Sequence, residues 1–439
     1  MKKYLYVLAI ALAGLCVSCN KDKTAPDPAE VDFQKGGTVL KPTEQQTKVE
    51  NTAVAVIDAV NPQDFSQLVN LIEHFVTEYC NENVDFSEVE AALGKKIESA
   101  YTYQEVINSD TKEYFSASYF ETLMLQFSTI TGKIEANSTK WTYEESDKLT
   151  ISFKDADGKP CLLEATAKGE LGYLPFYSSY DYFSQYNFDE DGDGVVDYDY
   201  YEVESTNTVM VNLPEEFNYT LKDDGTELMK ASYVFKTNIA SITDQANVAD
   251  IYFDGTAVFE VVGYKFELRR AFLDMQNLEI SSAITKGNQI IISEKAAIND
   301  FAINAAQEIG FEGGKFEAKL NVLGEVQLYC EVPQMDVLAQ LLNEGPKGDS
   351  VEEIQAYLDS VNGAYKLEIH FDNTAAVQGR LELRILPVIG DELSVRPVIV
   401  FNDGSSYALE DYFNGEMLER IEQRIQQLAN QFEAITTTA

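Results

Sequence analysis

The chain has 439 residues, of which 73 are acidic and 33 are basic, so its formal net charge at pH 7 is −40. A charge of this sign excludes nucleic acid and anionic lipid surfaces as expected partners. Hydrophobic residues make up 45% of the chain, enough to bury one large core or two ordinary ones.

The amino terminus carries the features of an export signal. A short basic leader precedes an apolar stretch, residues 4–15, which is too short to span a bilayer. A small residue, Ser18, then precedes Cys19 and a polar run. This arrangement resembles the lipobox of bacterial lipoproteins, particularly those of Bacteroidota.

The resemblance implies a signal peptide over residues 1–18 and acyl chains such as palmitate on Cys19, with Cys16 as the alternative lipidation site. Each buried methylene contributes roughly 0.8 kcal/mol, so two or more chains anchor a protein firmly. The implied location is the cell envelope, on either face of the outer membrane. The membrane is therefore an expected partner through the anchor alone.

The next segments predict a spacer and then helices. Residues 19–48 are rich in Lys, Asp, Pro, Gly, Thr and Gln, a composition typical of a flexible tether. Residues 49–140 are expected to be mainly helical, with a cap at Asn61 and apolar residues spaced three and four apart from there to Cys80. The thiol of Cys80 continues this apolar face, so we expect it to be buried.

After residue 141 the pattern changes to short alternating runs separated by Asp-Gly and Asn-Gly pairs, which are typical of hairpin turns. The clearest strands, residues 315–332 and 365–371, are apolar on one side only. Burial of one side favours antiparallel sheet backed by helices. We therefore expect an antiparallel β region over 141–310 and an α+β region over 311–439.

The chain is expected to end in an amphipathic helix over residues 411–435. Its apolar residues follow a narrow seam that predicts packing against the chain's own sheet, with a coiled coil as the alternative. The seam consists of Leu418, Ile421, Ile425, Leu428, Phe432 and Ile435. The predicted fold class is thus α+β, with N-terminal helices, an extensive antiparallel β-sheet and this C-terminal helix.

The sharpest chemical feature is the acidic segment over residues 189–202, DEDGDGVVDYDYYE. Its closely spaced carboxylates repel one another unless a cation lies between them, and an oxygen-only ligand set points to calcium. The alternative is a solvated Asp/Gly turn. The candidate ligands are the side chains of Asp189, Asp191, Asp193 and Asp197 and the carbonyl of Val195.

An EF-hand loop needs a bidentate Glu at position 12, where this chain has Tyr200. The segment therefore more closely resembles the D-x-D-x-D-G-x-x-D calcium loops of hairpins, as in integrin-type propeller blades. Asp199, Glu202 or a water molecule is left to supply the last ligand.

Aromatic residues are dense on both sides of this loop. Tyrosine combines a rigid apolar face with a hydrogen-bonding tip, so these residues suggest a platform for a glycan or a protein surface. The alternative is that they belong to the core. The candidate platform residues are Tyr177, Tyr180, Tyr182 and Tyr186.

Catalytic patterns are weak, because the chain has two histidines, His74 and His370, and both are expected to be solvated. Cys330 lies in an apolar strand phase and is expected to be an inert buried thiol. The expected function is a lipid-anchored, calcium-binding, non-catalytic envelope protein that binds a glycan or a protein. The alternatives are a carrier of apolar molecules and a carboxylate-dependent glycoside hydrolase.

Overall fold

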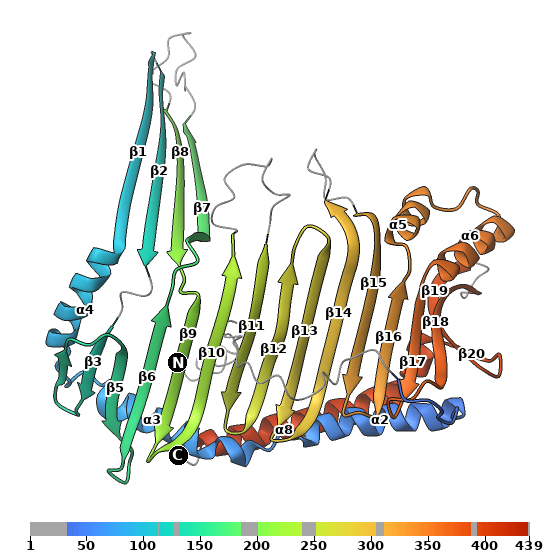
Figure 1. Ribbon diagram of the computed structural model, residues 1–439, viewed down its shortest axis with the longest axis horizontal. Coiled ribbons are helices and arrows are strands. Elements are labelled where there is room, and N and C mark those ends of the chain that lie inside the picture. Colours follow the sequence, from blue (N-terminus) through green and yellow to red (C-terminus); the bar gives the residue numbers. More distant parts are fainter. Residues whose placement is uncertain are drawn as a thin grey trace, which may run out of the picture.

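The computed structural model describes residues 33–112, 114–126, 131–185, 201–238, 252–303, 311–387 and 393–437, with backbone alone for 94–112, 114–126, 173–185, 201–211, 302–303, 311–312, 387, 393 and 436–437. The chain is mostly β-sheet, with helices at both ends (Figure 1). The helices are α2 (Pro42–Asp58), η1 (Pro62–Phe65), α3 (Ser66–His74), η2 (Phe75–Tyr79), α4 (Ser87–Ala100), α5 (Met335–Glu344), α6 (Val351–Ala364), α7 (Leu409–Tyr412) and α8 (Gly415–Thr437).

Sixteen strands form one mixed sheet in the order β20-β19-β18-β17-β16-β15-β14-β13-β12-β11-β10-β9-β6-β5-β3-β4. Most neighbours are antiparallel, and β3 and β5 are parallel. The strands are β3 (Gly132–Ala136), β4 (Trp141–Glu144), β5 (Leu149–Lys154), β6 (Pro160–Lys168), β9 (Glu216–Asp223), β10 (Thr226–Thr237), β11 (Phe253–Val261), β12 (Tyr264–Leu273), β13 (Asn277–Lys286), β14 (Gln289–Ile303), β15 (Phe311–Val322), β16 (Val326–Val332), β17 (Lys366–Phe371), β18 (Val377–Pro387), β19 (Leu393–Phe401) and β20 (Ser406–Ala408).

A second sheet of four strands has the order β1-β2-β8-β7 and extends beyond one end of the large sheet (Figure 1). The predicted helical region over 49–140 is therefore wrong after Ala100, where β1 begins. This segment is rich in Tyr, Thr and Phe, which favour strands. The strands are β1 (Tyr101–Lys112), β2 (Tyr114–Gln126), β7 (Tyr173–Gln185) and β8 (Tyr201–Asn212).

The two faces of the large sheet differ in polarity, as the alternation in the sequence predicts. Register pairs Phe316 with Val332 and Leu320 with Leu328, and Leu328 is also opposite Ile369. One apolar row crosses six strands in register, and we call the face that it defines the apolar face. This row contains Phe266, Ile284, Ile292, Val322, Val326 and Phe371.

Helices α2, α3 and α8 run along one end of the sheet, the lower end in Figure 1. Residues of α3 and η2 pack against the apolar face of β5 to β14, and residues of α2 pack against β17 and β19. The hairpin turns at this end contain Val262 and Leu323, whose φ angles are 45° and 54°. Both side chains pack against the core cluster, and this burial offsets the cost of an unfavourable backbone angle.

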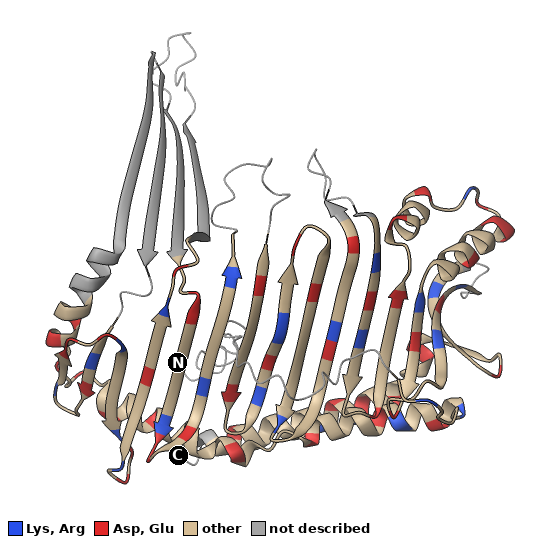
Figure 2. Cartoon of the chain, in the orientation of Figure 1, with Lys and Arg blue, Asp and Glu red and all other residues tan. Residues whose placement is uncertain are grey.

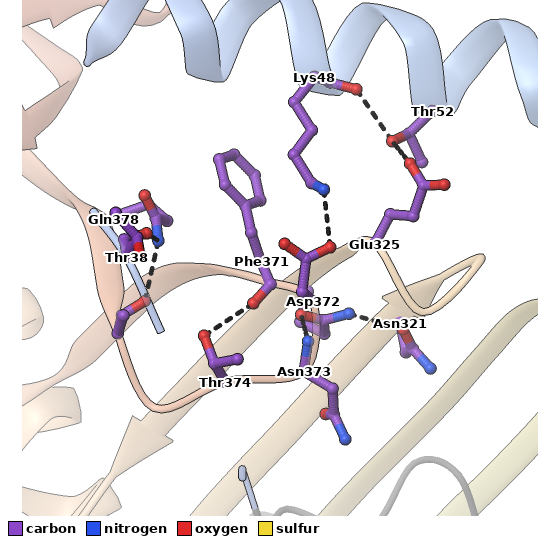
Figure 3. Close-up of polar contacts among 12 residues, drawn as sticks. Thr38, Lys48, Thr52, Asn321, Glu325, Phe371, Asp372, Asn373, Thr374 and Gln378 are labelled. Atoms are coloured by element: carbon purple, nitrogen blue, oxygen red, sulfur yellow. Dashed lines mark hydrogen bonds and ion pairs between the residues drawn. The ribbon is translucent and has the colours of Figure 1, made fainter. Parts of the chain in front are cut away.

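Helix α2 includes residues 42–48, which the sequence pattern assigns to the flexible tether. Pro42 occupies the first turn, and the carboxylate of Glu44 accepts a hydrogen bond of 3.0 Å from the backbone N–H of Lys41. These are ordinary helix-start features. Lys48 of α2 also forms an ion pair of 2.7 Å with Asp372 in the β17–β18 turn (Figure 3). Local capping and tertiary contacts therefore extend the folded body into this segment.

Helix α8 packs against α2 and η1. Its apolar seam predicts that α8 packs against the sheet, but α2 occupies that place. Arg420 Nη2 lies 2.8 Å from Glu50 Oε2, and Arg424 Nε lies 2.6 Å from Asp58 Oδ1. Of the predicted seam, Ile435 is buried, whereas Leu418 and Ile425 are 52% and 53% exposed.

Candidate binding faces of the sheet

Several predicted sites lie outside the described residues. These are Cys19, Tyr186 and the proposed calcium ligands Asp189, Asp191, Asp193, Val195 and Asp197. The strands on either side of the acidic segment are described, and Gln185 pairs with Tyr201 in antiparallel register. The segment therefore joins the two strands of the β7–β8 hairpin.

The other proposed platform residues lie in β7, where the backbone alone is described. Register places Tyr177 opposite Val209, Tyr180 opposite Thr206 and Tyr182 opposite Glu204. The three tyrosines therefore share one strand of the hairpin that holds the acidic segment.

Above the first apolar row, the same face carries a mixed row that includes Ser282 and the exposed Glu294. Two further apolar rows lie beyond it, and we call them the upper apolar rows. Their residues are partly exposed except for Val332, which is buried, and Ile280, which is 44% exposed. No described helix of the lower layer reaches them in Figure 1. The rows contain Ala271, Ile280, Ala296, Ala318, Cys330 and Leu367, followed by Leu273, Leu278, Ile298, Phe316 and Val332.

Aromatic side chains extend the same face across β9, β10 and β11. The ring centroids of Phe217 and Tyr233 are 5.6 Å apart, and those of Tyr233 and Phe235 are 4.8 Å apart. Gly255 makes this stack possible, because a Cβ atom there would lie 2.3 Å from the ring of Phe235. The stack ends at Phe253, whose ring centroid is 5.4 Å from that of Phe235.

The opposite face, which we call the charged face, carries ion pairs both between neighbouring strands and between residues two apart on one strand. Figure 2 shows acidic and basic residues on neighbouring strands of the large sheet. The strand register brings the pairs between strands together, because like positions of adjacent strands lie side by side. The pairs are Lys265–Glu267, Arg269–Glu267, Arg270–Glu279, Lys295–Glu279, Lys315–Glu317, Lys315–Glu331, Lys366–Glu331, Arg380–Glu368 and Arg384–Glu382.

His370 lies on the charged face, but the prediction that it is solvated is wrong. Its side chain is 3% exposed, because the ring of Phe33 stacks on it at a centroid distance of 4.1 Å. The chain segment that begins at Phe33 is held by Gln34, which exchanges backbone hydrogen bonds with the β17–β18 turn. A residue far away in the sequence therefore covers a polar position on the strand.

The surroundings of His370 favour the neutral ring. Burial lowers its pKa below 6.5, and Nδ1 lies 3.0 Å from the carbonyl oxygen of Thr374. Nε2 lies 3.4 Å from a carboxylate oxygen of Glu368, and Lys319 Nζ lies 4.4 Å from the centroid of the covering Phe33 ring. This arrangement closes the histidine away from solvent and fits a role in holding the segment at residue 33.

Because the unfolded chain binds a proton at His370 more tightly than the folded chain does, stability is expected to fall as pH decreases below about 6.5. One such group changes the free energy of unfolding by at most about 1.4 kcal/mol per pH unit. The measurement is urea unfolding between pH 7.5 and 5, above the range in which carboxylates titrate. His370→Gln is expected to weaken this dependence of the free energy of unfolding on pH. An unchanged dependence would contradict the lowered pKa of His370.

The three cysteines within the described residues are free thiols. The prediction that Cys80 is buried is wrong, because η2 is a turn of π-helix that shifts the helical phase and buries Tyr79 instead. Cys161 is buried beside Asp223, and this burial, followed by the hydrogen bond to that carboxylate, raises its pKa to about 12. Cys330 is half-buried in an upper apolar row.

Two grooves lie between helices of the described chain. A groove of about 370 Å³ separates α5 from α6, and one of about 240 Å³ separates the end of α2 from α8. Within the described residues, no group of three or more His, Cys, Asp or Glu side chains is placed to hold a metal ion. None of the described helices is both long enough and apolar enough to cross a membrane.

Comparison of the chain with protein-family models, with curated proteins and with solved structures gave no match. The two faces of the sheet are therefore the features from which a function can be inferred.

Proposed function

We propose that this chain is a lipid-anchored, calcium-binding, non-catalytic protein of the cell envelope that binds another envelope protein through the upper apolar rows. The anchor at Cys19 rests on the lipobox resemblance, and Cys19→Ser is expected to move the protein from the membrane fraction to the soluble fraction. Retention of this variant in the membrane would contradict the anchor.

The observation that carries the binding function is a broad apolar surface left open beside a helical layer. With strands about 4.8 Å apart, β9 to β17 span roughly 40 Å, and the open part of the strands is roughly 20 Å long. The resulting area of about 800 Å² is what each partner buries in an ordinary protein interface.

A protein surface suits this area better than a small molecule does. The open face is broad, and the two grooves of about 370 and 240 Å³ lie elsewhere, between helices. Small ligands usually need a concave site that buries most of their surface. A flat apolar face instead matches the central part of a protein interface.

A photocross-linking experiment on intact cells tests this proposal. A benzoylphenylalanine in place of Ile280 is expected to form a discrete adduct with a second polypeptide, because this side chain is 44% exposed within the upper rows. The same group in place of Leu342, which is 55% exposed on α5, is the matched control. Absence of a protein adduct at 280, or equal adducts at both positions, would overturn the proposal.

A carrier of apolar molecules is the second candidate, because the upper apolar rows contain no charged residue. Mass analysis of the cross-linked product separates the two candidates. A lipid adduct at position 280, together with co-purified lipid in native mass spectrometry, would favour the carrier.

Calcium binding is expected to need the acidic segment of the β7–β8 hairpin. Titration calorimetry of the full mature chain should detect binding at or below millimolar calcium, and Asp191→Ala or Asp193→Ala should abolish it by removing a charged ligand. Asp349→Ala, an exposed acidic position before α6, is the control for net charge. Equal binding by all variants would contradict the site.

A further inference from the structure

The charged face of the large sheet differs from the rest of this acidic chain in its balance of charge. Over the whole chain 33 basic residues face 73 acidic ones. Among the ion-paired residues of β12 to β18, basic residues outnumber acidic ones. The basic residues are Lys265, Arg269, Arg270, Lys295, Lys315, Lys366, Arg380 and Arg384, and the acidic residues are Glu267, Glu279, Glu317, Glu331, Glu368 and Glu382.

The basic groups also lie outermost. The side chain of Lys366 is 55% exposed, whereas its partner Glu331 is 17% exposed. Arg380 is likewise 55% exposed, and its partner Glu368 is 11% exposed. In each of the other pairs of this face, the basic side chain is likewise more exposed than its acidic partner. A molecule that approaches the face therefore meets the cations first.

We propose that this face binds an anionic polysaccharide that lies across the strands. From β12 to β18 the cations extend over about 30 Å, since six strand spacings of about 4.8 Å separate these strands. Arginine and lysine bind carboxylate and sulfate groups through charge-assisted hydrogen bonds. The site lies on the face opposite the upper apolar rows, so it does not depend on the proposed protein partner.

The net charge of −40 does not prevent such binding at physiological ionic strength. The Debye length there is about 8 Å, so distant carboxylates are screened while cations in contact with the ligand are not. A polysaccharide with one charge per sugar matches this moderate excess of cations. Nucleic acid carries a denser row of charges and depends on releasing many counterions, which this face cannot neutralise.

The test uses the full mature chain with polygalacturonate as the probe and neutral dextran as the reference polymer, at 0.15 M salt. The triple variant Lys315→Gln, Lys366→Gln and Arg384→Gln is expected to weaken polygalacturonate binding about tenfold or more. A matched control removes three exposed lysines elsewhere: Lys133→Gln, Lys140→Gln and Lys347→Gln. Because it changes net charge equally, it should stay within about twofold of the native chain.

The charge-conserving variant Lys315→Arg, Lys366→Arg and Arg384→Lys is expected to retain binding, which separates charge from folding. Binding should also decrease as salt rises. Failure of the native chain to bind polygalacturonate, or an equal loss in both Gln triples, would overturn the proposal. Equally tight binding of single-stranded DNA would also overturn it, by showing a surface that accepts any polyanion.

Discussion

Replacing Phe371 by alanine is expected to lower the free energy of unfolding by about 3–5 kcal/mol. The side chain is 2% exposed and packs in the cluster formed by the apolar face of β17 and β19 and by α7, beside α2. Lys48 of α2 lies 5.6 Å from the centroid of its ring. The substitution therefore leaves a cavity where the helical layer meets the sheet. Urea unfolding followed by circular dichroism measures the effect.

Phe272→Ala is the matched control for this prediction. Phe272 lies near the upper end of β12 and is half-buried, with the Arg270 guanidinium 4.4 Å from its ring centroid. A partly exposed ring loses less buried area, so we expect a cost of about 1 kcal/mol. Equal losses for the two substitutions would contradict the position of the core at the helical end of the sheet.

Gln378→Leu is expected to cost about 2–4 kcal/mol, although it replaces an amide with an apolar side chain of similar size. Gln378 is 1% exposed, and its Oε1 accepts a hydrogen bond of 2.9 Å from the N–H of Leu40. Its Nε2 donates one of 2.9 Å to the carbonyl oxygen of Thr38 (Figure 3). Leucine would remove the partners of both part-buried backbone groups, the N–H of Leu40 and the carbonyl of Thr38.

The Gln378 side chain fixes the segment that leads into α2. The substitution should therefore destabilise this segment locally as well as lower the stability of the whole fold. Hydrogen exchange is expected to accelerate over residues 33–41 in the Gln378→Leu variant. Gln340→Leu on α5 is the control, because that amide is exposed and bonds only to Glu344 of the same helix. Unchanged exchange over 33–41 would contradict a role for Gln378 in holding the segment.

The alternation over residues 315–332 and 365–371 could be predicted because its evidence is local. The single run expected over 315–332 is two antiparallel strands, β15 and β16, joined by a turn. A period of two with one apolar side fixes which residues share a face, and the register of Leu320, Leu328 and Ile369 confirms it. The order of sixteen strands could not be predicted, since every hairpin offers the same backbone groups for pairing. Calcium binding by the acidic segment of the β7–β8 hairpin stays a prediction.

Long-range contacts explain where prediction from the sequence was wrong. Residues 33–48 have the composition of a tether, yet Gln378 and Asp372 hold them from more than 300 positions away. His370 occupies a polar strand position that Phe33 covers. The wrong prediction for Cys80 has a local cause instead. Its burial was expected from a regular helical period, and the π-helical turn η2 interrupts that period. The charged face could be predicted only in part: some of its ion pairs join residues two apart on one strand, and the others form only after the strands are in register.

The large sheet ends in its shortest strands, β4 with four residues and β20 with three. Long unpaired borders invite further chains to join by backbone hydrogen bonding, which is how fibrils grow. Edge strands of four and three residues offer an incoming chain few backbone groups for hydrogen bonding. The lateral borders of so wide a sheet are therefore poor seeds for polymerisation, and encounters between neighbouring molecules are directed to its faces.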